Sequence, residues 1–175
     1  AASSDGLTGN PVSFTAGATT GTASAIALNA GDGQSATVGT AVAIAPAVIV
    51  RDQLNNPVAG VAVTFAITTG GGSVSPATPV LTDANGIAAL TTWTLGNSAG
   101  SNTLTATAGA LAGSPVSFSA TGTAGAASSI ALQAGDAQTA TVGTAVAIAP
   151  VVIARDQFNN PVAGVAVTFA VASGG

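Results

Sequence analysis

Residues 26–71 read IALNAGDGQSATVGTAVAIAPAVIVRDQLNNPVAGVAVTFAITTGG, and residues 130–175 repeat this stretch 104 positions later with 9 differences among 46 residues. The N-terminal segment continues the pattern, because Leu7 and Phe14 correspond to Leu111 and Phe118 at the same offset. A period of 104 residues is far longer than the roughly 20–50 residues of solenoid repeats, and it is the size of an independent domain. We therefore expect the C-terminal strands of one repeat at 1–22, a complete repeat at 23–126 and the N-terminal half of another at 127–175.

The apolar residues within a repeat alternate with small or polar residues, a pattern that is typical of half-buried strands. The alternation is clearest at 61–67 and at 116–120. Turn-forming residues separate such stretches, namely Asn55-Asn56-Pro57, Gly70-Gly71-Gly72, Asp83-Ala84-Asn85-Gly86 and Leu95-Gly96-Asn97-Ser98. No apolar stripe with a helical period persists. The pattern predicts an all-β sandwich, and the expected core anchors are Trp93, Phe65 and Phe118.

Several linked motifs follow one another along the chain, at residues 48–52, 56–65, 70–72, 82–88, 93–96 and 104–107. Together they resemble the bacterial Ig-like group 1 family, whose domains occur in invasin- and intimin-type adhesins. The resemblance covers essentially the whole chain. It implies an all-β chain of tandem immunoglobulin-like β-sandwich domains with Greek-key connections and no substantial helix, used in series as an extracellular bacterial stalk.

One spacing departs from the family pattern. In that pattern, GxAxVxW, the turn glycine and the tryptophan are an even number of residues apart and so face the same side of the strand. Here the stretch from Gly86 to Trp93 reads GIAALTTW, which is one residue longer. A single extra residue would turn Trp93 to the solvent face unless the strand absorbs it. We therefore predict a β-bulge near Thr91 and Thr92. The inward-facing residues would then be Ala88, Leu90, Trp93 and Leu95.

The chain is almost uncharged, with a net charge of −4 and 5% charged residues, against about 25% in ordinary globular proteins. Two arginines and no lysine cannot form the clustered basic patch that nucleic-acid binding requires. No uncharged apolar run approaches the roughly 20 residues of a membrane-spanning helix. His, Cys, Glu and Lys are absent, which excludes the usual catalytic triads, cysteine nucleophiles, zinc sites and Schiff-base lysines. We therefore expect no enzymatic activity and no catalytic, cofactor-binding or metal-binding residue.

Arg51-Asp52 and its repeat Arg155-Asp156 are the candidate site, because they hold the only basic side chains of the chain. One interpretation is a local turn, in which Asp and Asn side chains accept backbone N–H bonds and the arginine pairs nearby. The other interpretation is a polar contact between domains or between chains.

Two further patterns with aspartate favour turns, at Gly31-Asp32-Gly33 with its repeat Gly135-Asp136 and at Asp83-Ala84-Asn85-Gly86. Their alternative interpretation is calcium binding at a domain junction. Because Ca²⁺ takes about six to eight oxygen ligands and each stretch offers a single carboxylate, turns are favoured. We therefore expect no cofactor, with calcium at a junction as the open alternative.

The leading functional hypothesis is a non-enzymatic extracellular repeat that forms the stalk or shaft of a bacterial surface fibre or filament. Uncharged edge strands without lysine favour self-association, so the expected partners are copies of the same chain, end to end or side by side. The alternative is an adhesin-type module that recognises a host protein, a glycan or a neighbouring cell through aromatic and arginine anchors. A third hypothesis is an accessory domain of a carbohydrate-processing enzyme. The expected location is the cell surface or the extracellular space.

Overall fold

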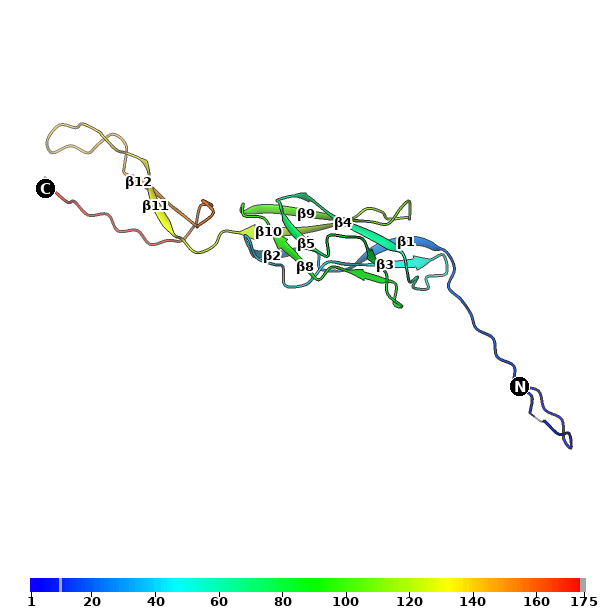
Figure 1. Ribbon diagram of the computed structural model, residues 1–175. Helices are drawn as coiled ribbons and strands as arrows, with labels where there is room; N and C mark the ends of the chain where they lie inside the picture. The colour runs from blue at the N-terminus through cyan, green and yellow to red at the C-terminus, as the bar shows by residue number, and fades with distance from the viewer. Residues whose placement is uncertain (10, 174–175) are drawn as a thin grey trace.

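The structure is a computed structural model that describes residues 1–9 and 11–173, and every regular element in this part of the chain is a β-strand (Figure 1). The strands of the central unit are β1 (Ala23–Ala30), β2 (Gln34–Thr37), β3 (Ala47–Asp52), β4 (Ala62–Thr69), β5 (Gly72–Ser75), β6 (Val80–Leu81), β7 (Ile87–Ala89), β8 (Thr92–Leu95), β9 (Gly100–Thr107) and β10 (Val116–Thr123). Two more strands follow, β11 (Ser129–Ala134) and β12 (Val151–Arg155). The described residues contain no helix that is long and apolar enough to span a membrane.

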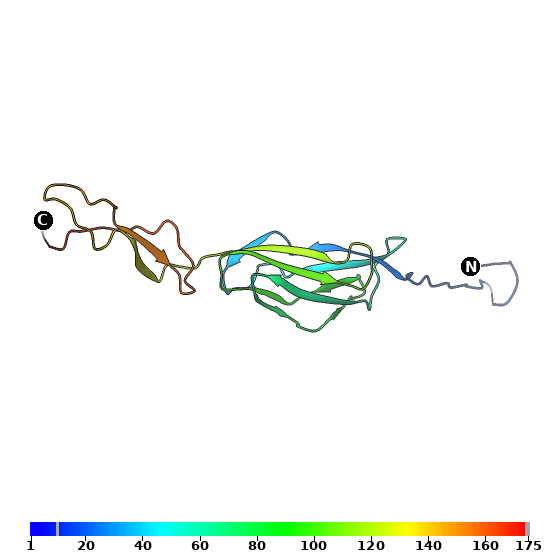
Figure 2. The ribbon, with the colours of Figure 1, turned by 90° about the horizontal axis from the view of Figure 1, so that it is seen from above.

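Strands β1 to β10 build a sandwich whose layers are visible in Figure 2. One sheet has the order β1-β3-β7, and the other has the order β2-β10-β9-β4-β6. A third, two-stranded sheet consists of β5 and β8. The paired strands are antiparallel except for β2 and β10, which run parallel. This architecture confirms the all-β fold that the period-two alternation predicted.

The core lies between the layers, and strand alternation decides which side chains enter it. In β10, Val116 and Phe118 are buried, whereas Ser117 between them is exposed. The rings of Phe65 and Phe118 lie 6.4 Å apart, centroid to centroid, with their planes tilted by 43°. Trp93 and Phe118 are fully buried, and Phe65 keeps 7% of its surface exposed. Burying a large aromatic side chain stabilises a fold by about 3 kcal/mol or more relative to alanine, so these three residues contribute strongly to stability.

The extra residue before Trp93 is absorbed by a strand break, and the predicted bulge within one strand is wrong. β7 pairs with β3 and ends at Ala89, whereas β8 begins at Thr92 and pairs with β5. Leu90 and Thr91 therefore connect strands of two different sheets. Because the chain passes from one sheet to another here, the alternation of inward and outward side chains shifts by one residue without a bulge. The buried residues of this stretch are Ala88, Leu90, Trp93 and Leu95.

The two ends of the chain extend from opposite ends of the sandwich (Figure 1). The N-terminal bridge between Ala2 and Val12 matches the pair Ala106 and Val116 of β9 and β10, one period later. β11 pairs with β12 in the register of β1 with β3. Residues 166–173 lie one period after β4 and form no strand. The predicted segments 1–22 and 127–175 also include Asn10, Gly174 and Gly175, which lie outside the described residues.

Candidate interdomain contact site

The turn after β3 and the turn after β12 share one sequence pattern and one set of hydrogen bonds. They read RDQLNNP at 51–57 and RDQFNNP at 155–161. Asn55 and Asn159 have positive φ angles of 67° and 71°, a conformation that asparagine tolerates better than most residues. Arg51 Nη1 donates to the carbonyl of Asn55 at 2.8 Å, and Arg155 Nη1 donates to that of Asn159 at 2.7 Å. Each arginine therefore bonds to the backbone of its own turn.

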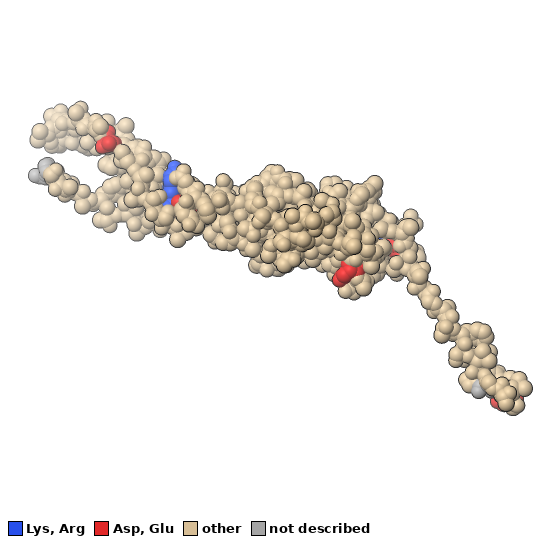
Figure 3. Space-filling model, viewed as in Figure 1, with Lys and Arg blue, Asp and Glu red and all other residues tan. Residues whose placement is uncertain are grey.

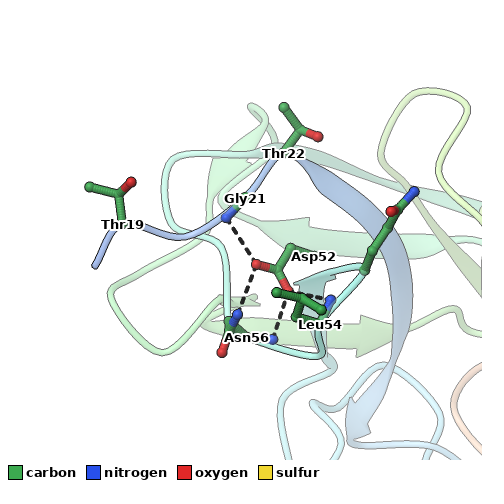
Figure 4. A pocket seen from close by; sticks show the side chains of 7 residues that line it. Thr19, Gly21, Thr22, Asp52, Leu54 and Asn56 are labelled. Carbon is green, nitrogen blue, oxygen red and sulfur yellow. Dashed lines mark hydrogen bonds between the residues drawn. The ribbon is translucent and has the colours of Figure 1, made fainter.

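Asp52 connects its turn to the segment that precedes β1 (Figure 4). Its Oδ1 accepts the backbone N–H groups of Leu54 and Asn56, both at 2.9 Å. Its Oδ2 accepts the N–H of Gly21 at 2.9 Å and the side-chain amide of Asn56 at 3.0 Å. The side chain of Asn56 and these backbone donors favour the charged carboxylate, and they lower the pKa of Asp52 to about 2.

Asp156 makes the corresponding bonds one period later. Its Oδ1 accepts the N–H groups of Phe158 and Asn160 at 2.9 Å. Its Oδ2 accepts the N–H of Gly125 and the side-chain amide of Asn160, also at 2.9 Å. Burial raises the pKa of Asp156, but the bonds from Asn160 and Gly125 outweigh this effect and the pKa falls to about 2. The two aspartates thus hold equivalent segments 104 residues apart, at Gly21 and at Gly125.

Asn160 makes the hydrogen bonds that cross from one repeat to the other. Its Nδ2 donates to the carbonyl of Asn97 at 2.8 Å, and its Oδ1 accepts the N–H of Ala99 at 2.8 Å. Phe158 lies beside Gly39, where a Cβ atom would come within 3.3 Å of the phenyl ring. We call this contact of Phe158 and Asn160 with Gly39, Asn97 and Ala99 the joint. Asn160 is 7% exposed, and both the oxygen and the nitrogen of its carboxamide are hydrogen-bonded, as expected for a buried polar group.

The sequence singled out the arginines and aspartates of these turns, and it missed the asparagine. The structure places each Arg–Asp pair in one turn. The aspartate accepts a hydrogen bond from the segment that precedes β1 or β11, and the arginine donates one to a carbonyl of its own turn. In sequence, Asn56 and Asn160 both look like ordinary turn residues. The signal that distinguishes Asn160 is its set of partners 61 and 63 residues earlier in the chain, which only the folded structure reveals.

The two other predicted aspartate patterns are turns with local or cross-strand roles. Asp32 Oδ1 accepts the N–H of Ser119 at 2.7 Å and its hydroxyl at 2.9 Å, and the backbone bond lowers the pKa of Asp32. Asp83 Oδ1 accepts the N–H groups of Asn85 and Ile87, at 2.8 and 2.9 Å, and the bond from Ile87 lowers the pKa of Asp83. No group of three or more metal-binding side chains occurs within the described residues.

The sequence model of the bacterial Ig-like domain (group 1) matches residues 25–116. The chain belongs to this family. The match runs from within β1 to the first residue of β10. A search of curated protein sequences finds no match.

Two solved structures resemble this member of the Ig-like family. The structure of FdeC, an Escherichia coli adhesin, aligns with a TM-score of 0.53 and 18% identity over 82% of this chain and 45% of that chain. Domains 4–9 of the surface layer protein SbsC align with a TM-score of 0.44 and 20% identity, over 81% of this chain and 21% of that chain. The likeness to FdeC shows a shared fold, and this chain spans less than half of that protein's length.

Proposed function

We propose that this chain is a non-enzymatic, extracellular structural element, in which Ig-like repeats in series form the stalk or shaft of a bacterial surface fibre. The joint is the observation that carries this proposal, since it holds one repeat against the next through specific hydrogen bonds. The sandwich and the C-terminal unit, which comprises β11, β12 and their loops, follow one another along one direction, as a spacer requires (Figure 1). FdeC, which shares the fold, is an adhesin, and this supports a place at the cell surface.

The low surface charge supports association between copies of the chain. Figure 3 shows a face that is almost free of charged residues, and its basic atoms lie where the sandwich meets the C-terminal unit. Proteins usually protect exposed strand edges with charged side chains, above all lysine. This chain contains no lysine. We propose that its copies associate end to end or side by side.

An adhesin-type binding module is the second candidate function, and the adhesin FdeC is the observation that favours it. In that case a host protein, a glycan or a neighbouring cell would be the ligand. Binding sites of this kind usually rely on exposed aromatic or arginine anchors. The aromatic residues of the sandwich, Trp93, Phe65 and Phe118, are all buried, which favours the structural role.

Three measurements test the proposed function. Small-angle X-ray scattering of the purified chain should give an elongated particle, and a compact particle would contradict the stalk. Antibodies against residues 23–126 should label intact cells that produce the protein, and labelling only after lysis would contradict the surface location. Sedimentation equilibrium should show mass that increases with concentration. A single monomeric species at all concentrations would contradict self-association, and specific binding of that monomer to host cells would favour the adhesin.

A further inference from the structure

The turn after β3 is a copy of the turn that forms the joint, but its outward face is open. Asn56 donates its side-chain amide to Asp52, and its Oδ1 has no hydrogen-bond partner among the described residues. Leu54 is 83% exposed, whereas its counterpart Phe158 is 37% exposed. A surface hollow of about 290 Å³ adjoins the turn (Figure 4). Its lining residues are Thr19, Gly21, Thr22, Asp52, Gln53, Leu54 and Asn56.

The chemistry of the open turn defines the partner that it fits. A carboxamide offers an oxygen acceptor and two N–H donors; when one N–H bonds to the aspartate, the oxygen and the second N–H match a backbone N–H and a backbone carbonyl that lie side by side. In the joint, Asn97 provides that carbonyl and Ala99 provides that N–H. The carboxamide of Asn56 is already held by the carboxylate of Asp52, as that of Asn160 is held by Asp156. The open turn is therefore prearranged for a loop like 96–99.

We infer that Leu54 and Asn56 dock onto the β8–β9 loop of another repeat of this kind, in the geometry of the joint. In that contact Asn56 bonds to the counterparts of Asn97 and Ala99, and Leu54 covers the counterpart of Gly39. The joint itself supports this occupant. In the joint, the equivalent turn after β12 already binds the β8–β9 loop through Asn160. The inference rests on the proposed series of repeats, and it names the residues that fix each repeat to the one before it.

The test uses a longer chain in which residues 23–126 are present twice in succession, followed by residues 127–175. The turn of the second copy then follows a complete repeat, whereas the turn of the first copy does not. Ser117 is exposed and the chain has no cysteine, so Ser117→Cys in both copies places one spin label on each. Pulsed electron–electron resonance then measures the distance between the two copies.

We expect one narrow distance in the parent chain and a broad distribution when Asn56→Ala is made in the second copy. Asn56→Ala in the first copy is the matched control, and it should leave the distance narrow. Ala99→Pro in the first copy removes the N–H donor from the other side, so it should broaden the distribution as well. Thermal unfolding by circular dichroism verifies that each variant is folded.

Two results would overturn the inference. One is a broad distribution in the parent chain, which would mean that the second joint does not form. The other is an unchanged narrow distance when Asn56→Ala is made in the second copy and that variant is folded. This would mean that the segment connecting the two copies alone fixes their relative orientation. Both results come from purified protein, so they are independent of whether the chain works at a cell surface. A failed surface location would leave the docking result intact, and the reverse also holds.

Discussion

The substitution Asn160→Ala should open the joint between the two repeats. It removes the bond to the Asn97 carbonyl and the bond from the Ala99 N–H, both 2.8 Å long. A hydrogen bond contributes about 0.5–1.5 kcal/mol net, so the two crossing bonds together stabilise the closed joint by roughly 2 kcal/mol. Because about 1.4 kcal/mol corresponds to a factor of ten, the ratio of closed to open joints should fall about 30-fold. A joint that is closed in about 99% of molecules would then be closed in about three quarters.

Spin labels on the two sides of the joint measure this change directly. Ser117 in β10 and Ala131 in β11 are exposed, so Ser117→Cys and Ala131→Cys provide the labelling positions. The parent chain should give one narrow distance, and Asn160→Ala should add a broad component. Asn56→Ala is the matched control, because among the described residues the side chain of Asn56 bonds only within its own turn. If Asn160→Ala leaves the distribution as narrow as the control does, the carboxamide does not hold the joint and the reasoning fails.

Three further predictions concern the sandwich itself. Trp93→Ala should lower the free energy of unfolding in urea by about 3–5 kcal/mol, because Trp93 is fully buried. Trp93→Phe should cost clearly less, since the indole Nε1 has no hydrogen-bond partner among the described residues, and equal costs would contradict this account. The pKa of Asp52 is lowered to about 2, so its contribution to stability is present above about pH 4 and is lost as the pH falls toward 2. Asp52→Asn should flatten this part of the stability curve measured by denaturation at pH 2–6, and an unchanged slope would count against the carboxylate. Gly72→Ala should destabilise more than Gly71→Ala, because both have positive φ but only at Gly72 would a Cβ collide with backbone; equal melting temperatures would refute this.

The sequence was sufficient to predict the core residues, because each strand has its own alternation of apolar and polar residues. Alternation around Phe65 and Phe118 assigns inward and outward faces without knowledge of any partner strand. The stretch before Trp93 shows the limit of this logic. Parity identified the buried residues, but it could not distinguish a bulge from a change of sheet, because that choice depends on whether β8 pairs with β5 or with β3.

The joint could not be predicted because its determinants are not local. Asp52 and Asp156 have the same neighbours in sequence and make the same bonds within their turns. Of the two equivalent asparagines, Asn160 bonds to the β8–β9 loop, and its partners there are backbone groups, which carry no sequence signal. The repeated arginine–aspartate pairs led to the prediction of a polar contact between domains or between chains. They could not indicate which atoms would meet.

The joint is built from the kind of interaction that this composition leaves available. With two cations in 175 residues, ion pairs cannot hold every repeat to the next, and surface ion pairs are weak and screened by salt. A carboxamide that bonds to a carbonyl and an N–H carries no net charge, so salt weakens these hydrogen bonds far less than it weakens ion pairs. The nearby carboxylate of Asp156 has a pKa lowered to about 2, so it stays charged and keeps its bond to the N–H of Gly125 down to strongly acidic pH. Bonds of these two kinds therefore hold residues 155–161 against the β8–β9 loop and against Gly125 in a chain that has almost no charge.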